Sequence, residues 1–230
     1  MPYGTADGAG ARRREQLRTA RLYFVCEAMP NGEDPEPLLR AALDGGVDII
    51  QLREKSGDNR LIDRAGTTFR RLADAYSVPF IVNDDPELVE RLGADGVHVG
   101  QDDMSVAEVR EVVGREALIG LSTHSPEQLE AAIAAGGADY LSAGPIWETP
   151  TKEGRPATGL EFISFAARTT ALPFFAIGGI DTGNVEQVLE AGARRLCVVR
   201  AIRDSEDPAA TAASLRRAFA SVGDEVAPGG

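Results

Sequence analysis

A short segment recurs four times along the chain, and it constrains the fold more than any other feature of the sequence. Each copy places a glycine suited to end a helix directly before an apolar strand, and successive copies lie 47, 44 and 55 residues apart. Each interval is long enough for two strand-helix units, so the copies mark every second strand of an eight-unit chain. The four copies are Gly46-Val47-Asp48-Ile49, Gly93-Ala94-Asp95-Gly96, Gly137-Ala138-Asp139-Tyr140 and Gly192-Ala193-Arg194-Arg195.

Eight apolar runs suited to strands alternate with amphipathic stretches suited to helices, such as 60–76. An open, doubly wound sheet of eight strands is one arrangement of such units. Four evenly spaced pairs of strand-helix units favour a second arrangement, an α/β fold consisting of a single (β/α)8 TIM barrel. The predicted strands are 22–26, 47–52, 80–83, 96–99, 117–122, 140–143, 174–177 and 196–199.

Length and composition fit one globular domain. The chain has 230 residues, of which 43% are hydrophobic and 26% are charged. We predict a flexible N-terminal segment over 1–20, a catalytic barrel over 21–222 and a flexible C-terminal tail over 223–230. Cys26 and Cys197 are too few for a disulfide framework and are expected to be buried free thiols, although a closed barrel would make their strands neighbours.

Charge and hydropathy exclude several classes of partner. The chain carries 24 basic and 36 acidic residues, a net charge of −12 that argues against nucleic-acid binding. No apolar run approaches the roughly 20 residues needed to cross a bilayer. Three arginines near the N-terminus lack the apolar stretch of a secretory signal, so we expect a cytoplasmic protein. The sequence allows a homo-oligomer without requiring one.

Lysine usage points toward phosphate chemistry. Of the 24 basic residues 22 are arginine, and the two lysines are Lys55 and Lys152. A compact ammonium and a planar guanidinium are not interchangeable at a phosphate. In the segment 51–55, period-two alternation turns Gln51, Arg53 and Lys55 toward the barrel axis. Such cations at a barrel mouth need anions to pair with, although a solvated strand end is the simpler alternative.

A long insertion follows the strand 140–143. It spans 144–156, contains the only tryptophan of the chain, Trp147, and has the length of a functional lid. Hydroxyls and an ammonium suited to phosphate binding lie within it at Thr149, Thr151 and Lys152. Near the C-terminus, Gly178-Gly179 and Val199-Arg200 follow the last two predicted strands, where TIM barrels commonly bind phosphate.

Acidic and polar residues beyond those needed to cap helices follow the strands 80–83, 96–99 and 117–122. Asp84 and Asp103 would face each other across the mouth and repel unless a cation lies between them. Mg²⁺ prefers one or two carboxylates together with waters and phosphate oxygens, so both are candidate Mg²⁺ ligands. Solvated loop acids are the alternative. Asn83 and Ser122 likewise have no capping role.

Six motifs, taken together and in this order, resemble the thiamine phosphate synthase (thiamine-phosphate pyrophosphorylase) family. The resemblance extends over about residues 22 to 202, and at Val199-Arg200 the chain departs from the small hydroxyl residue that the family often presents. The motifs are QLREK at 51–55, NDD at 83–85, GADGVHVGQDD at 93–103, GLSTH at 120–124, GPIWETPTK at 144–152 and AIGGI at 176–180.

The resemblance implies a transferase of thiamine biosynthesis. It would join 4-amino-2-methyl-5-(diphosphooxymethyl)pyrimidine to thiazole phosphate with Mg²⁺, giving thiamine phosphate and diphosphate. Asp84 and Asp103 would hold the metal, and Ser122 would lie beside the reacting pyrimidine. The pyrimidine diphosphate would be bound by Gln51, Arg53, Lys55, Asn83 and Lys152. The thiazole phosphate would be bound by Thr149, Thr151, Gly179, Val199 and Arg200.

The resemblance also assigns catalysis to Arg53, Lys55, Ser122 and Lys152. Two rival interpretations share the phosphate site. A thiazole tautomerase-like barrel would not need paired carboxylates beside QLREK, and a non-catalytic phosphate-binding barrel would show ligand affinity without turnover. The roles of Trp147 and His124 are open, since each side chain suits a structural contact as well as a substrate contact.

Overall fold

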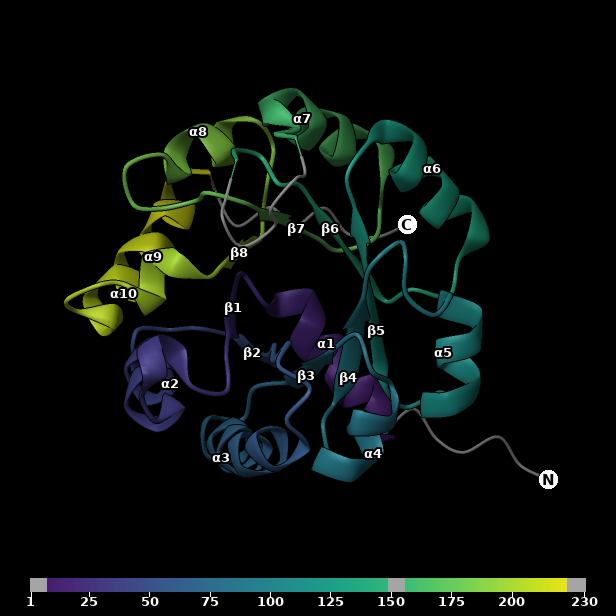
Figure 1. Cartoon of the computed structure of the whole chain (residues 1–230). Helices are drawn as coiled ribbons and strands as arrows, with labels where there is room; N and C mark the ends of the chain where they lie inside the picture. Colours follow the sequence, from purple (N-terminus) through teal and green to yellow (C-terminus); the bar gives the residue numbers. More distant parts are fainter. Residues whose placement is uncertain (1–7, 149–155, 223–230) are drawn as a thin grey trace.

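Eight parallel strands close into a barrel in the order β1 to β8, with β8 hydrogen-bonded to β1 (Figure 1). This computed structural model describes residues 8–148 and 156–222. The predicted (β/α)8 fold is confirmed, and most strand boundaries agree with those expected from the sequence. The strands are β1 Leu22–Cys26, β2 Ile49–Leu52, β3 Phe80–Asn83, β4 Gly96–Val99, β5 Leu118–Thr123, β6 Tyr140–Ala143, β7 Phe174–Ile177 and β8 Leu196–Val198.

Helices cover the outside of the barrel, and each strand leads through a loop into the next helix (Figure 1). Polar caps begin several of them, including a capping box of Ser105 and Glu108 at α5. The outer helices are α2 Pro35–Asp44, α3 Asn59–Tyr76, α4 Glu87–Leu92, α5 Val106–Val113, α6 Pro126–Ala135, α7 Gly159–Thr169, α8 Val185–Glu190, α9 Arg200–Arg203 and α10 Pro208–Ala218. Short 3₁₀ turns lie at Pro30–Gly32 and Phe219–Val222.

Alternation along the strands divides the core into two layers. Outward residues such as Phe24 and Phe80 pack beneath the helices, while inward residues such as Tyr23, Tyr140 and Phe175 fill the barrel. Cys26 belongs to the outer layer and Cys197 to the inner layer, and both are buried free thiols as expected. Because they lie on opposite faces of the sheet, the crosslink that neighbouring strands would allow does not form.

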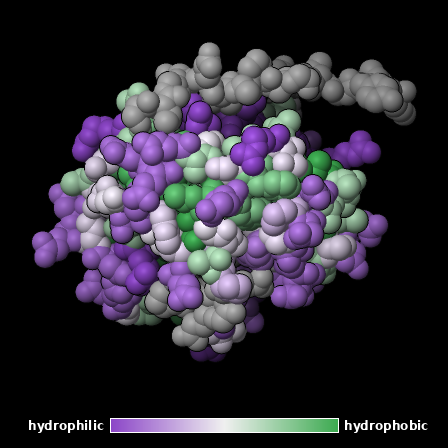
Figure 2. Space-filling model, turned by 90° about the horizontal axis from the view of Figure 1, so that it is seen from above, coloured by the Kyte–Doolittle hydropathy of each residue, from purple (hydrophilic) through white to green (hydrophobic). Residues whose placement is uncertain are grey.

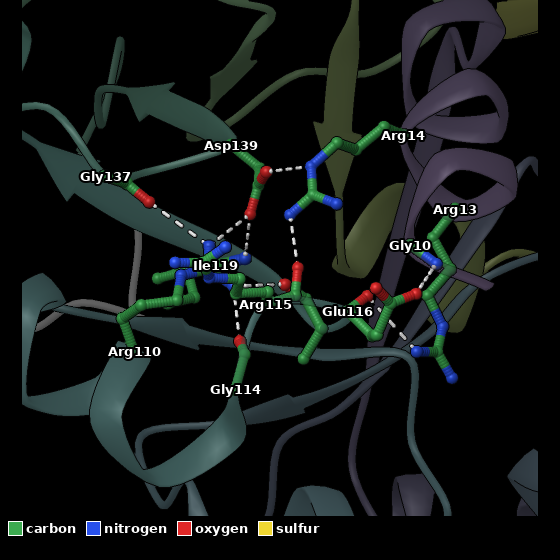
Figure 3. Close-up of polar contacts among 11 residues, drawn as sticks. Gly10, Arg13, Arg14, Arg110, Gly114, Arg115, Glu116, Ile119, Gly137 and Asp139 are labelled. Atoms are coloured by element: carbon green, nitrogen blue, oxygen red, sulfur yellow. Dashed lines mark hydrogen bonds and ion pairs between the residues drawn. The ribbon is translucent and has the colours of Figure 1, made fainter. Parts of the chain in front are cut away.

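The N-terminal segment differs from its prediction as a flexible arm over 1–20. Residues Ala9–Thr19 form helix α1, which closes the barrel at the end where the strands begin. Arg13 Nε donates to Asp95 Oδ1 at 2.8 Å. Arg14 Nε donates to Asp139 Oδ1 at 2.7 Å (Figure 3). These partners lie more than 80 residues away, so the helix is stabilised by contacts that its local sequence does not reveal.

In three of the four copies of the recurring segment, an aspartate has the same structural role. Asp48 accepts from the N–H of Leu22 at 2.9 Å, Asp95 from that of Phe80 at 3.0 Å, and Asp139 from that of Ile119 at 2.8 Å. Each carboxylate therefore satisfies the backbone at the start of a neighbouring strand. Together with α1, these aspartates form the floor of the barrel, which leaves the opposite end, the mouth, for a site.

The surface over α6 to α8 is mostly hydrophilic, with a hydrophobic group near the middle of the face seen in Figure 2. Within the described ranges, large hydrophobic side chains classed as exposed are Met29, Met104 and Val112. No helix in those ranges is long and apolar enough to cross a membrane. The cytoplasmic location, the homo-oligomer and the exact domain limits stay predictions.

Candidate active site

A cavity of about 770 Å³ opens where the strands end. Nine of the residues predicted to form the site line it, contributed by β2, β3, β5, α9 and the loops that follow strands. They are Gln51, Arg53, Lys55, Asn83, Asp84, Asp103, Ser122, Val199 and Arg200. A second cavity of about 300 Å³ adjoins the first, shares Val199 and Arg200 with it, and contains Gly179. Thr149, Thr151 and Lys152 lie outside the described residues.

The cationic side of the large cavity follows β2. Gln51 is 3% exposed, and its side-chain Nε2 has no hydrogen-bond partner among the described residues. Buried amides are normally satisfied, so an unpartnered one that lines a cavity is available to a ligand. Arg53 and Lys55 follow the end of β2 and line the same cavity, and the Lys55 Nζ is 3.9 Å from Asp84 Oδ2.

Two carboxylates face this cationic side. Burial and the negative charge of Asp103 raise the pKa of Asp84, while Lys55 and Arg53 act in the opposite direction. Asp103 Oδ2 accepts from the N–H of Gly100 at 2.7 Å, which fixes the second carboxylate within the loop after β4. Asp84 is held in the left-handed region at φ 64°. The two acids are thus placed close enough to repel each other.

This pair has the donor chemistry of a magnesium site. Two hard carboxylate groups that repel each other gain from a divalent cation, and Mg²⁺ takes its other ligands from water and phosphate. Within the described ranges no group of three or more His, Cys, Asp or Glu side chains is arranged to hold a metal. Asp84 and Asp103 therefore fit an ion that substrate oxygens would help to coordinate, rather than a cage made by protein alone.

A chain of polar side chains connects Ser122 to the middle of the barrel, and sequence reasoning missed it. The Ser122 hydroxyl lies 3.0 Å from His98 Nε2, and His98 Nδ1 lies 3.2 Å from the Tyr140 hydroxyl. The Tyr140 hydroxyl is in turn 3.1 Å from that of Tyr23. Period-two alternation places all four side chains inside the barrel, so their inward direction was available from the sequence although their contacts were not.

Burial keeps both phenols of this hydrogen-bonded series, Tyr23 and Tyr140, neutral. Desolvation raises the pKa of Tyr23 and of Tyr140 well above its ordinary value. The hydroxyls are therefore donors and acceptors that hold His98 rather than sources of charge. His98, so held, fixes the hydroxyl of Ser122 at the wall of the cavity.

Glycines shape the smaller cavity after β7. Gly178 and Gly179 have φ angles of 107° and 71°, which favour glycine. A Cβ on Gly178 would lie 2.5 Å from the Cα of Pro145. The N–H of Trp147 donates to the Gly178 carbonyl at 3.2 Å, so the start of the insertion packs on this loop.

His124 lines the large cavity and also contacts the start of the insertion. Its Nδ1 lies 2.5 Å from the carbonyl oxygen of Gly144, at the start of the insertion. Thr123 in the same segment donates to the carbonyl of Ser142 at 2.9 Å. The end of β5 therefore supports the insertion, while both Ser122 and His124 line the cavity.

Glu27 and Arg203 also line the large cavity and were not predicted as site residues. Arg203 Nη1 lies 2.6 Å from Glu27 Oε1, across the seam between β8 and β1. Nothing in the local sequence around either residue signals the other, because 176 positions separate them.

The fold and the site together define a class: a (β/α)8 barrel enzyme whose mouth carries cations, paired carboxylates and a glycine-rich loop suited to phosphorylated substrates. The family model for thiamine monophosphate synthase matches residues 22–202. The chain belongs to that family and is a transferase of thiamine biosynthesis.

Individual relatives agree with this assignment. The chain is 49% identical to a thiamine-phosphate synthase of Thermus thermophilus, over 85% of this chain and 95% of that protein. It is 46% identical to the thiamine-phosphate synthase of an Arthrobacter species, over 88% and 95% of the two chains. The solved thiamine phosphate pyrophosphorylase of Pyrococcus furiosus superposes with a TM-score of 0.81 at 31% identity, covering 91% of this chain and 98% of that one.

Proposed function

We propose that the protein joins 4-amino-2-methyl-5-(diphosphooxymethyl)pyrimidine to thiazole phosphate, releasing diphosphate and forming thiamine phosphate. One observation carries this proposal: a single cavity brings Arg53 and Lys55 opposite the paired acids Asp84 and Asp103, with the unpartnered amide of Gln51 beneath them. A diphosphate needs the cations, a metal needs the acids, and a heterocycle with an amino group and ring nitrogens needs the amide.

The pyrimidine diphosphate would lie along the β2 and β3 side of the cavity. Arg53 and Lys55, with Asn83 and Lys152, would bind its phosphate oxygens, and the side-chain amide of Gln51 would hydrogen-bond the pyrimidine. Asp84 and Asp103 would hold Mg²⁺. When bound, Mg²⁺ would supply positive charge to the leaving diphosphate oxygens.

Breaking the bond between carbon and oxygen sends an electron pair to the diphosphate and leaves positive charge on the pyrimidine CH₂. Arg53, Lys55 and Lys152 would stabilise the leaving group, while the ring delocalises the cation. The thiazole nitrogen then donates its lone pair to the carbon. No proton has to be removed in this step, so the residues act by positioning and charge, and Ser122 would orient the pyrimidine.

The thiazole phosphate would occupy the smaller cavity. Gly179, the backbone at Val199 and Arg200, and the hydroxyls of Thr149 and Thr151 would bind its phosphate. The two cavities share Val199 and Arg200, so the heterocycle of the second substrate would project toward the pyrimidine. The Arg200 side chain would add a positive charge at that boundary.

Turnover is the direct test. Purified protein mixed with both phosphorylated heterocycles and Mg²⁺ should yield thiamine phosphate and diphosphate, measured by chromatography, and EDTA should stop the reaction until Mg²⁺ is restored. Absence of product under these conditions would reject the synthase. Isomerisation of the thiazole alone would favour the tautomerase-like alternative, and binding without turnover would favour a non-catalytic barrel.

Two variants test the cationic side. Arg53→Ala and Lys152→Ala should each lower kcat/KM by at least about tenfold, since each removes a charge from the leaving diphosphate. Circular dichroism and thermal unfolding should match the wild type. Asp63→Asn on the outer helix α3, where Arg91 lies 2.6 Å from Asp63, is a matched control for loss of one charge. A wild-type rate for either cavity variant would contradict its role.

A further inference from the structure

The seam between the first and last strands carries an ion-pair network that the proposed reaction does not use. Arg203 Nη1 lies 2.6 Å from Glu27 Oε1, while its Nε and Nη2 donate to Asp204 Oδ1 at 2.6 Å and Oδ2 at 3.1 Å. One guanidinium therefore joins the residue after β1 to the residue after α9. These contacts hold the pKa of Asp204 below its ordinary value, chiefly through the hydrogen bonds from Arg203.

The network lies between the two cavities. Glu27 and Arg203 line the large cavity, and Asp204 lines the small one. Arg203 is occupied by two carboxylates, so its charge is not offered to a phosphate. Arg200, one turn earlier, lines both cavities and has no ion pair within the part of the chain that the structure describes.

Arg203 is also part of the turn that would bind the second substrate. Its N–H donates to the carbonyl of Val199 at 3.0 Å, and the N–H of Asp204 donates to that of Arg200 at 2.9 Å. Fixing the Arg203 side chain to β1 therefore fixes the backbone at 199–200. A displaced turn would carry that backbone and the Arg200 side chain away from the small cavity.

Fold stability does not account for the pair. The side chains of Arg203 and Glu27 are 19% and 31% exposed, so the cost of desolvating both charges offsets much of their attraction. The second oxygen of Glu27, Oε2, is buried without a hydrogen-bond partner among the described residues, which costs free energy.

We propose that Glu27 and Arg203 form a positioning pair that fixes the α9 turn and thereby sets the affinity for the phosphate of the second substrate. The pair does not touch the reacting atoms. This inference rests on the proposed function, because it assigns the small cavity to thiazole phosphate. It names the pair as a determinant of specificity for one of the two substrates.

The test separates the two substrates. In Glu27→Gln and in Arg203→Gln, the KM for thiazole phosphate should rise by roughly tenfold, while the KM for the pyrimidine diphosphate stays within about twofold. Both substitutions break the contact between Glu27 and Arg203, and Arg203→Gln also loses the hydrogen bonds to Asp204. The double variant should therefore be no worse than Arg203→Gln alone. The control is Asp63→Asn, which removes an ion pair of the same length on the outer helices and should change neither KM.

Binding provides a readout that does not depend on turnover. Trp147 is the only tryptophan and lies beside Gly179, where a Cβ would come within 3.0 Å of the Trp147 Cβ. Its fluorescence should report a titration with thiazole phosphate alone, and the dissociation constant should rise in both single variants as the KM does. Thermal unfolding of each variant checks that the barrel remains folded.

The possible outcomes are distinguishable. A wild type that binds thiazole phosphate more tightly than the variants but forms no product would reject the synthase and keep the positioning pair. An active wild type with unchanged variants, or with both KM values raised together, would overturn the pair. Additive losses in the double variant, or a wild type that binds thiazole phosphate no better than the variants, would overturn it as well.

Discussion

Tyr140 connects the interior of the barrel to the site, and its hydroxyl has two partners. It lies 3.1 Å from the Tyr23 hydroxyl and 3.2 Å from His98 Nδ1, and the residue is fully buried. Tyr140→Phe should therefore remove one hydrogen-bond partner from the buried Tyr23 hydroxyl and one from His98 Nδ1, and lower the free energy of unfolding by about 1–3 kcal/mol. Urea unfolding measures the loss.

Tyr76→Phe is the matched control for that substitution. The Tyr76 hydroxyl also has a polar partner, Asp44 Oδ1 at 2.5 Å, but this contact is exposed and water can replace it. Its loss should cost less than about 0.5 kcal/mol. Equal losses of unfolding free energy in the two variants would show that the buried contacts of Tyr140 contribute no more than a surface hydrogen bond.

Asp84 combines an unusual backbone conformation with a perturbed carboxyl. Asparagine tolerates the left-handed region, so Asp84→Asn removes the charge at little cost to the backbone at φ 64°. If Asp84 holds the metal, the Mg²⁺ concentration for half-maximal rate should rise by at least about tenfold in this variant. An unchanged Mg²⁺ requirement would exclude Asp84 as a ligand.

The same variant has a pH signature when Mg²⁺ is removed by EDTA. Burial and Asp103 raise the pKa of Asp84 in the folded protein, so the folded state binds the proton more tightly than the unfolded state. The stability that this proton provides is present at low pH and is lost as pH rises through the folded pKa. Asp84→Asn should accordingly gain stability relative to wild type between about pH 4 and pH 7, as measured by urea unfolding.

At the scale of elements, helix α1 depends on carboxylates of the barrel floor. Burial opposes ionisation of Asp95, but hydrogen bonds from the N–H of Phe80 and from Arg70 and Arg13 outweigh it and hold its pKa below the ordinary value. A depressed carboxyl pKa gives stability that is present above the unfolded pKa, near 4, and is lost as pH falls through the folded pKa.

Asp95→Asn should lose about 2 kcal/mol near neutral pH and should depend less on pH below about 4 than the wild type. Urea unfolding across this range measures both effects. Asp63→Asn, whose carboxylate pairs on the exterior, should retain the wild-type slope. A wild-type slope in Asp95→Asn would show that the carboxylate does not link α1 to acid stability.

The elements that sequence reasoning predicted and the one it missed differ in where their stabilisation comes from. Strands such as β3 and β7 are predicted from apolar runs between turn residues, and their observed bounds agree with those runs. Helix α1 is rich in arginine and buries few residues, Gly10 and Leu17. Its stability comes from distant aspartates, so hydrophobic periodicity gave no signal.

At the scale of the whole molecule, the order of strands in the barrel determines which strand-end residues lie near one another. The strands of a barrel all end on one side, so the residues that follow β2, β3 and β4 meet at one mouth. The sequence therefore predicts that Arg53, Asp84 and Asp103 lie near one another, and all three line the large cavity. Closure of the barrel brings β8 against β1. The contact between Glu27 and Arg203 across that seam depends on side-chain geometry at two chain positions with no shared motif, so sequence order alone did not reveal it.

The barrel also separates stability from chemistry along its axis. Asp139 at the floor accepts from the N–H of Ile119 at 2.8 Å, from Arg14 at 2.7 Å and from Arg110 at 2.8 Å, and it lines neither cavity at the mouth. Asp139→Asn should lower the free energy of unfolding by about 2 kcal/mol and leave both KM values and kcat unchanged at a temperature where the variant is folded. Arg53→Ala, in contrast, should leave the free energy of unfolding unchanged and lower kcat/KM.

The double variant Asp139→Asn with Arg53→Ala then tests whether the two ends are independent. Because no described contact joins the two residues, the loss of stability should equal that of Asp139→Asn and the loss of kcat/KM should equal that of Arg53→Ala. Steady-state kinetics and urea unfolding of all four proteins give both quantities. A loss of kcat/KM in the double variant beyond that of Arg53→Ala would show that the floor affects the geometry of the mouth. The positions of Arg53 and Lys55 would then depend on the floor as well as on β2.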